Sequence, residues 1–331
     1  MIKRTLDLNK YSKSLFLFGP RQVGKTFLIT NTVSYDLFIN LLIQSEYLRY
    51  SRNPSILSKE IGSLTKSDPV VVIDEIQRCP DLLNEIQNIL ANPGVKFILS
   101  GSSARKLKRI GTNLLGGRAL NLHLHPLTFE ELKQQTDLDE ILKFGTLPNI
   151  IIEKNFDEKI QLLKGYSELY LKEEIQQEAV TRNVPAFAHF LELAAHENGN
   201  VLNFQNIARE VGIHSKTVKE YFNILEDTLV GFMLHPYKRS LRKRLISHPK
   251  FYLFDIGVGN ALRKELSLEL TSGTKKYGRL FEHFIILETM RLIDYHQKDA
   301  AASYFRTSDG AEVDLIIEFP DSVWELEIKS L

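Results

Sequence analysis

The fold of this chain is decided by the stretch Gly19-Pro20-Arg21-Gln22-Val23-Gly24-Lys25-Thr26. It matches G-x-x-x-x-G-K-[ST], the phosphate-binding P-loop. A strand-like apolar run (residues 15–18) precedes it and a helix-like run (residues 26–29) follows, which is the context that the motif requires. The glycines let the backbone turn tightly, so that amide groups and the positive end of the following helix face a phosphate. We therefore expect Lys25 to contact the β and γ phosphates and the Thr26 hydroxyl to be a Mg²⁺ ligand.

A second motif ends in two carboxylates. Residues 69–73 are mostly β-branched, which is typical of a parallel strand that is covered on both faces, and Asp74 and Glu75 follow them. Acids at the carboxyl end of such a strand lie where these sheets bind ligands. We expect Asp74 to hold Mg²⁺ through water and Glu75 to polarise the attacking water. The alternative is an acidic helix cap after a buried strand.

Further candidates follow the next strand-like run, residues 95–99. It ends at Ser100-Gly101-Ser102-Ser103, and Ser100 or Ser102 could sense the γ-phosphate by hydrogen bonding, although a plain turn explains the same residues. An arginine is needed to stabilise charge on the transferring phosphoryl group, from the same chain or from a neighbouring copy. Arg118 is preferred over Arg105, and either one could equally be a solvated surface side chain.

Together these motifs resemble the AAA-superfamily ATPases of bacteria and archaea, in particular ATP-binding proteins with a C-terminal domain of unknown function. The resemblance rests on residues 71–78 (VVIDEIQR), 99–104 (LSGSSA), 116–118 (GGR) and 126–132 (PLTFEEL). It implies ATP and Mg²⁺ as cofactors, a phosphate-binding role for residues 19–26, and catalytic roles for Lys25, Glu75 and Arg118. It also implies that residues 144–148 (FGTLP) close the ATPase core and that the helical pattern of residues 155–195 is a lid.

Composition and charge narrow the function classes. The chain has 331 residues, a net charge of +1, 43% hydrophobic residues and one cysteine, Cys79. The net charge argues against a uniformly basic nucleic-acid binder but leaves room for a local basic patch. A single cysteine excludes an internal disulfide and fits a reducing, cytoplasmic setting. No apolar run has the length of a signal peptide core or a membrane span, so we expect no membrane partner.

Residues 202–234 have the pattern of a winged helix-turn-helix. Asn203 can cap a helix, Gly212 supplies the turn, and Ser215 can cap a second helix. Spacing predicts that the second helix buries Val218, Tyr221, Phe222, Ile224 and Leu225. Such a helix can enter a major groove, and its exposed candidates for DNA contact are Lys216, Thr217, Lys219 and Glu220.

A basic segment follows this motif. No acid lies between Asp227 and Asp255, and the same stretch contains Lys238, Arg239, Arg242, Lys243, Arg244 and Lys250. We take Arg242, Lys243 and Arg244 as candidate phosphate contacts on DNA. The alternatives are a solvated basic loop and a winged helix that contacts only protein.

The C-terminal region carries a second set of carboxylates. A helix is expected at residues 277–290 with Glu282, followed by strands at residues 302–306, 312–318 with Asp314, and 323–329 with Glu327 and Lys329 on one face. Hard oxygen ligands suit Mg²⁺, and a lysine could orient water. The order resembles PD-(D/E)xK restriction-endonuclease-like nucleases, which implies metal ligation by Glu282, Asp314 and Glu327 and catalysis by Asp314, Glu327 and Lys329. Arg306 and Gly310 fit the same resemblance. A structural ion pair is the alternative for Glu327 and Lys329.

The predicted architecture is α/β. We expect a P-loop NTPase core with a parallel sheet (residues 1–150), a helical lid (151–198), a winged helix with the basic segment (199–250) and a partial, apparently C-terminally shortened nuclease-like domain (251–331). Three functions fit: ATP hydrolysis coupled to DNA binding or processing, an ATP-driven switch that binds a protein partner, and an ATP-gated defence or toxin-associated nuclease. An arginine donated by a neighbouring copy would imply a homo-oligomer.

Overall fold

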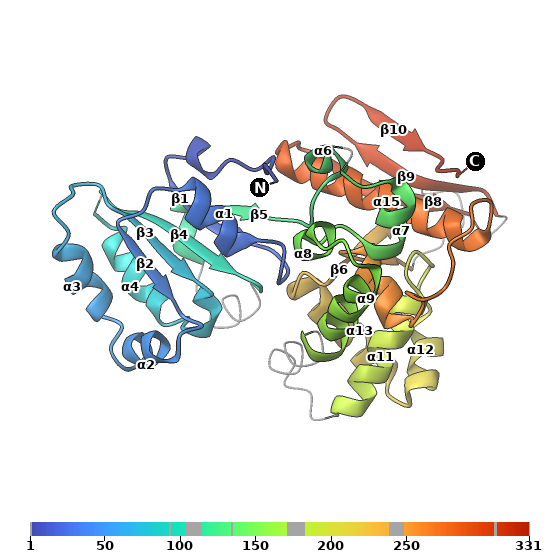
Figure 1. The fold of residues 1–331 in the computed structure, drawn as a ribbon, viewed down its shortest axis with the longest axis horizontal. Coiled ribbons are helices and arrows are strands. Elements are labelled where there is room, and N and C mark those ends of the chain that lie inside the picture. The colour runs from blue at the N-terminus through green and yellow to red at the C-terminus, as the bar shows by residue number, and fades with distance from the viewer. Residues whose placement is uncertain are drawn as a thin grey trace. The chain divides into compact units, whose positions relative to one another are not determined.

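The computed structural model describes residues 2–92, 94–103, 114–133, 135–170, 183–237, 248–307 and 310–330. These residues form two compact units. Unit 1 comprises residues 3–125, and unit 2 comprises residues 126–331 together with Ile2. Each unit contains one five-stranded sheet (Figure 1).

Unit 1 is built on a parallel sheet with the strand order β2-β3-β4-β1-β5. Its strands are β1 (Ser14–Phe18), β2 (Leu37–Asn40), β3 (Val70–Asp74), β4 (Lys96–Gly101) and β5 (Ala119–His123). Every residue of β1 is buried, and so are the last four of β3, as expected for interior parallel strands covered on both faces. Since β4 lies between β1 and β3, the carboxyl ends of these three strands meet at one edge.

Helices complete unit 1 in the alternating order of an α/β fold. They are α1 (Lys25–Thr32), α2 (Gln44–Arg52), α3 (Ile56–Gly62) and α4 (Leu82–Ile89), with short turns η1 (Leu8–Lys10), η2 (Ile76–Arg78) and η3 (Leu114–Gly117). The α1 helix follows β1 directly after the P-loop, and η2 follows β3 directly after Glu75. The parallel-sheet P-loop core predicted from the sequence is therefore confirmed.

The helices of unit 2 lie both before and after the first strands of its sheet in the sequence. They are α6 (Phe129–Leu132), α7 (Leu138–Phe144), α8 (Pro148–Ile152), α9 (Phe156–Gly165), the π-helical turn η4 (Tyr166–Tyr170), α11 (Val184–His196), α12 (Phe204–Val211), α13 (Ser215–Asp227), α14 (Ile256–Leu262) and α15 (Lys275–Tyr295). The side chains of Phe187, Phe190 and Leu191 on α11 are buried. Phe190 packs edge-on against Phe222 of α13, which joins α11 to α13.

The sheet of unit 2 is mixed and has the order β10-β9-β8-β6-β7. Its strands are β6 (Gly231–Pro236), β7 (Lys250–Leu253), β8 (Ala301–Arg306), β9 (Glu312–Glu318) and β10 (Val323–Leu326). Ile286 of α15 packs on Tyr304 of β8 and Leu315 of β9, and Figure 1 shows α15 alongside β8 and β9. The hairpin of β6 and β7 joins these C-terminal strands through a parallel pairing of β6 with β8, so one sheet crosses the boundary expected at residue 250.

The compact units also divide earlier than the boundary expected at residue 150. Residues 126–150 pack in unit 2, where Leu132, Ile141 and Leu142 share a core with Leu280 and Phe284 of α15. The motif at residues 144–148 therefore belongs to unit 2, although we expected it to close the ATPase core. Residues 126–150 pack in unit 2 because α7 buries its hydrophobic face against α14 and α15.

Candidate nucleotide-binding site

The P-loop connects β1 to α1 through a backbone with two left-handed residues. Gly24 has φ 93° and forms the N-cap of α1, and Gln22 has φ 64°. Alternation of left- and right-handed residues turns successive amide groups toward one side, which makes an anion-binding concavity. A Cβ on Gly19 would lie 2.3 Å from the carbonyl oxygen of Leu124, so only glycine allows the loop to start this close to the chain leaving β5.

The ammonium group of Lys25 lies within this loop. Its Nζ donates hydrogen bonds to the carbonyl oxygens of Gly19 (2.7 Å) and Pro20 (2.9 Å), and the residue is only 6% exposed. Carbonyl oxygens therefore hold a largely desolvated cation inside the loop predicted to bind phosphate. A charge in such surroundings interacts strongly with an anion.

The two residues predicted to bind Mg²⁺ contact each other. The Thr26 hydroxyl donates to Oδ2 of Asp74 (2.7 Å), and the Ser100 hydroxyl donates to the other oxygen, Oδ1. A hydroxyl and a carboxylate within hydrogen-bond distance form a hard oxygen donor pair, which fits Mg²⁺. Among the described residues, no group of three or more His, Cys, Asp or Glu is arranged to hold a metal ion.

Glu75 has a separate set of partners. Its backbone is left-handed (φ 60°), and its amide nitrogen lies 3.4 Å from the Ser100 hydroxyl. Oε2 of Glu75 accepts hydrogen bonds from Nε2 of Gln77 and from the Ser102 hydroxyl (3.5 Å). The two carboxylates therefore have different serine partners. The Ser100 hydroxyl donates to the carboxylate of Asp74, whereas the Ser102 hydroxyl donates to the carboxylate of Glu75.

Of the two candidate arginines, the structure describes only Arg118. Arg118 is exposed and donates to the carbonyl oxygen of Gln87 (3.3 Å), and Arg105 lies outside the described residues. Sequence reasoning missed a different arginine, Arg4, which donates to the carbonyl oxygens of Val23 (2.8 Å) and His125 (2.7 Å). Arg4 thus ties the P-loop to the end of unit 1. A basic residue near the N-terminus, outside any motif, gives no signal by which this contact could be predicted.

In unit 2, the residues predicted to form a nuclease site are only partly brought together. A pocket of about 650 Å³ is lined by Glu282, Asp314 and Lys329, but not by Glu327. Asp314 accepts a hydrogen bond from the amide of Ile328 (2.8 Å). Glu327 instead pairs with Lys329 (2.8 Å), and both side chains are mostly exposed. Strand β10 ends at Leu326, so Glu327 and Lys329 follow the strand that was predicted to carry them.

Glu282 is contacted by a buried lysine, Lys250. From the sequence alone, this lysine was not connected with the predicted nuclease site. Lys250 is 3% exposed, and its ammonium pairs with Glu282 (3.3 Å) and Glu312 (2.9 Å) beside the ring of Tyr304. The Tyr252 hydroxyl also donates to Glu282 (2.8 Å). Burial, together with the adjacent Glu282 charge, raises the pKa of Tyr252 well above its ordinary value, so the hydroxyl stays a donor. Glu282 is thus already paired with protein groups.

Two helices, α12 and α13, form where the sequence pattern suggested a helix-turn-helix. The Asn203 side chain accepts hydrogen bonds from the amides of Gln205 and Asn206, and Gly212 ends α12 in a left-handed conformation (φ 75°). The five side chains predicted to face inward on α13 are all buried. The predicted cap was wrong by one residue: His214 caps α13 and Ser215 begins it, because the imidazole Nδ1 accepts from the amide of Lys216.

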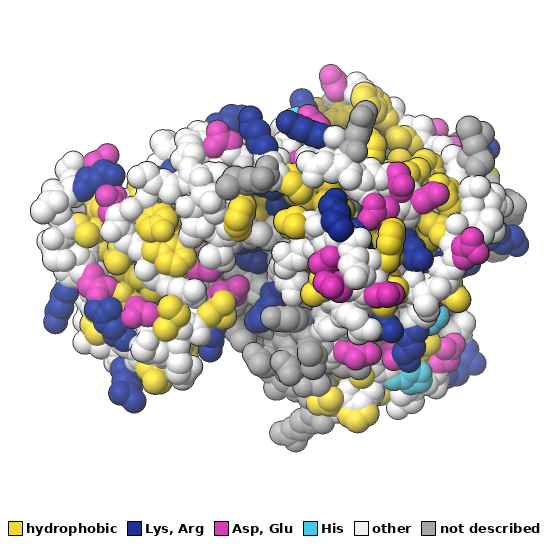
Figure 2. Space-filling model, in the orientation of Figure 1, with side chains coloured by type: hydrophobic (Ala, Val, Ile, Leu, Met, Phe, Trp, Pro, Cys, Tyr) yellow, Lys and Arg dark blue, Asp and Glu magenta, His cyan; other side chains and the backbone are white. Residues whose placement is uncertain are grey.

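The predicted DNA contacts fall into two groups. Lys216 and Lys219 are exposed on α13, Thr217 is half-buried, and the Lys219 ammonium lies 5.3 Å from the ring centre of Phe204. Arg242, Lys243 and Arg244 lie outside the described residues. On the face drawn in Figure 2, basic and acidic side chains are interspersed, in line with the net charge of +1.

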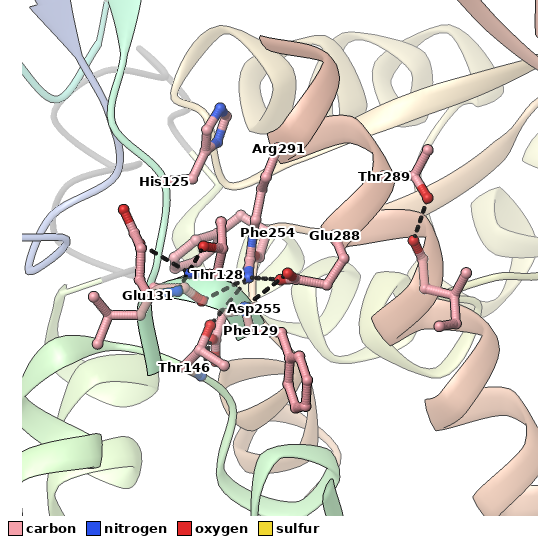
Figure 3. Close-up of polar contacts among 12 residues, drawn as sticks. His125, Thr128, Phe129, Glu131, Thr146, Phe254, Asp255, Glu288, Thr289 and Arg291 are labelled. Carbon is pink, nitrogen blue, oxygen red and sulfur yellow. Dashed lines mark hydrogen bonds and ion pairs between the residues drawn. The ribbon is translucent and has the colours of Figure 1, made fainter. Parts of the chain in front are cut away.

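The motif at residues 126–132 is held in unit 2 by a buried polar network (Figure 3). Thr128 and Glu131 form a capping box at the start of α6, and the amide of Phe129 donates to Glu288 (2.8 Å). Arg291 pairs with Glu288 (2.9 Å) and donates to the carbonyl oxygen of Leu127 (3.1 Å). The chain that leaves unit 1 is therefore fixed to α15 as soon as it enters unit 2.

Comparisons with protein families divide the chain into three segments. Residues 11–133 match a family described as an AAA domain. Residues 135–271 match a domain of unknown function (DUF8612), and residues 277–331 match another (DUF4143). The first match, together with the parallel sheet and the P-loop, supports an AAA-type P-loop ATPase core and ATP binding and hydrolysis in general.

The chain is also similar to proteins from distant organisms. An uncharacterized protein of Mycobacterium tuberculosis (Rv2008c) is 26% identical over 325 residues, which cover 95% of this chain and 70% of the relative. An uncharacterized protein of Methanocaldococcus jannaschii (MJ1544) is 24% identical over 324 residues, covering 88% and 70%. Among solved structures, the Bacillus subtilis DNA clamp loader delta protein aligns over 85% of this chain and 96% of its own at 11% identity. The TM-score of this alignment is 0.27. No described helix is long and apolar enough to cross a membrane.

Proposed function

We propose that this chain is a Mg²⁺-dependent ATPase whose nucleotide state controls DNA binding by unit 2. The observation that supports the ATPase most strongly is the pair formed by Thr26 and Asp74, because it unites the P-loop with the end of β3 at 2.7 Å. A hydroxyl after a P-loop lysine and a carboxylate at a strand end are the oxygen ligands that P-loop enzymes use for Mg²⁺. The AAA-domain match over residues 11–133 supports the same reaction.

In the proposed mechanism each group has one task. The backbone amides of residues 21–26 and the Lys25 ammonium would bind the phosphates, and Thr26 and Asp74 would hold a magnesium ion. A bound Mg²⁺ supplies neutralisation of the charge that builds up on the phosphate oxygens. Glu75 orients the attacking water by accepting a hydrogen bond from it. Ser100 keeps Asp74 in place, and Arg118 or Arg105, from this chain or a neighbouring copy, is proposed to stabilise the transferring group.

The DNA-binding part of the proposal rests on unit 2. Helices α12 and α13 have the turn, caps and buried face of a helix-turn-helix, and Lys216 and Lys219 are exposed on its second helix. Such a helix can lie in the major groove, with lysines on the phosphates. The basic residues Arg242, Lys243 and Arg244 are proposed to extend this contact.

A second candidate function is an ATP-driven switch whose C-terminal region recognises a partner without cutting DNA. The observation that favours it is Lys250, whose ammonium pairs with both Glu282 and Glu312. A carboxylate that is neutralised by a buried lysine is a poor ligand for a divalent metal, because the metal would have to displace that cation. The nuclease function, including its ATP-gated form, is therefore the less favoured proposal.

One experiment separates these functions. ATP hydrolysis is measured with and without duplex DNA, in Mg²⁺ and in EDTA, and plasmid integrity is followed in Mg²⁺ or Mn²⁺. The proposal predicts Mg²⁺-dependent hydrolysis that duplex DNA alters, with the plasmid intact. Hydrolysis that DNA leaves unchanged would favour the protein-binding switch. Plasmid nicking that disappears in Asp314→Ala would restore the nuclease.

A further inference from the structure

We propose that Gln77 is a positioning residue that holds the Glu75 carboxylate and links it to the serine turn at the end of β4. This inference rests on the proposed ATPase function and adds a residue to it. Gln77 is 4% exposed, and its Nε2 donates to Oε2 of Glu75 and to the Ser102 hydroxyl (3.0 Å). An amide N–H can only donate, so it binds the carboxylate of Glu75 as an acceptor.

The conformation of Glu75 makes such a restraint necessary. Residues other than glycine rarely adopt a left-handed backbone, and they keep it where their surroundings hold them there. Glu75 has φ 60° and ψ 46° directly after β3. This turn gives the adjacent carboxylates different partners: Asp74 contacts Thr26 and Ser100, whereas Glu75 contacts Gln77 and Ser102.

The turn after β4 is shaped to admit the Gln77 amide. A Cβ on Gly101 would lie 2.6 Å from Oε1 of Gln77, so glycine at this position leaves the space that the amide fills. Oε1 itself is buried without a hydrogen-bond partner. The orientation of the amide is accordingly set by its Nε2, which faces Glu75 and Ser102.

These contacts connect two parts of the proposed site. Ser102 lies on the strand end proposed to sense the γ-phosphate, and Glu75 is the group proposed to orient water. Since Gln77 bonds to both, a movement of the serine turn changes the orientation of the Glu75 carboxylate. Orientation matters because a displacement of about 1 Å in a reacting group can reduce a rate by about 10²-fold.

The test compares Gln77→Met, Gly101→Ala and the exposed control Gln44→Met in the full chain. Methionine preserves the volume of Gln77 but removes the Nε2 donor. The alanine methyl of Gly101→Ala displaces the amide. Gln77→Met is expected to keep the wild-type melting temperature, and both variants should keep the Mg·ATP dissociation constant within about twofold. Their kcat is expected to fall about 10- to 100-fold. The control should match the wild type in all three quantities.

A double-mutant cycle with Glu75→Gln shows whether Gln77 acts through Glu75. If it does, Gln77→Met lowers kcat by less than about twofold in the Glu75→Gln background. Wild-type kcat in Gln77→Met, or an equal loss in both backgrounds, would overturn the inference while leaving the ATPase proposal intact. A wild-type chain that does not hydrolyse ATP, or a Glu75→Gln variant with full activity, would overturn both.

Discussion

At the scale of single residues, the proposed site contains positions where only one amino acid fits, because a neighbouring group lies too close for any other. Gly19 illustrates this, because the carbonyl oxygen of Leu124 fills the space where a Cβ would lie. The amide of Leu124 is itself fixed by a hydrogen bond to the carbonyl oxygen of Phe18 (2.7 Å), so the backbone there cannot easily move away. The P-loop motif requires a glycine at this position because of its tight turn. The structure shows a second reason, which is the close approach of the chain after β5.

We predict that Gly19→Ala lowers the free energy of unfolding by about 1–3 kcal/mol, the usual cost of forcing atoms into a packed site. It should also weaken Mg·ATP binding at least about tenfold, because the loop must shift. Denaturant unfolding and calorimetric titration measure the two effects. Gly62→Ala is the control: nothing lies within 4 Å of its added methyl, at the end of α3. If the two variants were equally stable and bound ATP equally well, the proposed close contact would be unimportant.

At the scale of elements, the strands were the most predictable part of the chain. The apolar runs before residues 19, 74 and 100 became β1, β3 and β4 because interior parallel strands need continuous apolar side chains. The caps of α12 and the buried face of α13 were also predictable, because capping residues and helical spacing are local features of the sequence. Partners far apart in the sequence were not: neither the role of Lys250 between Glu282 and Glu312 nor that of Gln77 beside Ser102 follows from local pattern.

The long helix α15 carries a buried histidine that makes the stability of unit 2 depend on pH. His283 is 1% exposed, and its Nε2 lies 2.7 Å from the carbonyl oxygen of Leu253, so this nitrogen carries the proton of a neutral ring. Burial lowers the pKa of His283 to about 3, from 6.5 in an unfolded chain. Because the unfolded state binds the proton first, the contribution of His283 is complete above pH 6.5 and is lost as the pH falls toward 3.

We predict that the free energy of unfolding of unit 2 falls below pH 6.5, with His283 contributing up to about 1.4 kcal/mol per pH unit. Denaturant titrations between pH 7.5 and 4.5 would measure the slope. His283→Gln can keep a donor for the Leu253 carbonyl oxygen and should flatten it. His296→Gln, at an exposed position after α15, should leave it unchanged. The same slope in His283→Gln as in the wild type would contradict the assignment.

At the scale of the whole molecule, the chain clusters into two compact units, whereas the sequence pattern suggested four parts. The sequence pattern separated a lid, a winged helix and a nuclease-like domain, but the β6–β7 hairpin and strands β8 to β10 form one sheet. This pairing could not be predicted because the parallel contact of β6 with β8 joins residues 235 and 303. Unit 2 thus contains one continuous sheet that both of these regions share.

If unit 2 binds DNA through α13, its affinity must depend on salt through the lysines of that helix. We predict that replacing Lys216 and Lys219 with alanine reduces the slope of log K against log salt by about 1.8, or about 0.9 for each phosphate that a lysine no longer neutralises. Fluorescence anisotropy with labelled duplex DNA at several salt concentrations measures this slope. Lys264→Ala removes an exposed lysine paired with Glu192 and serves as the control. An unchanged slope in the double variant would exclude α13 from the DNA interface.

The central claim is that residues 19–26 bind ATP and that Glu75 orients the water that hydrolyses it. The most direct measurement follows Mg·ATP binding and single-turnover hydrolysis by the wild type, Lys25→Ala and Glu75→Gln. We predict that Lys25→Ala loses binding by at least about 10²-fold, because it removes the buried ammonium from the loop. Glu75→Gln should bind as the wild type does and hydrolyse at least about 10²-fold more slowly. Unaltered ATP binding by Lys25→Ala, or wild-type turnover by Glu75→Gln, would contradict the account.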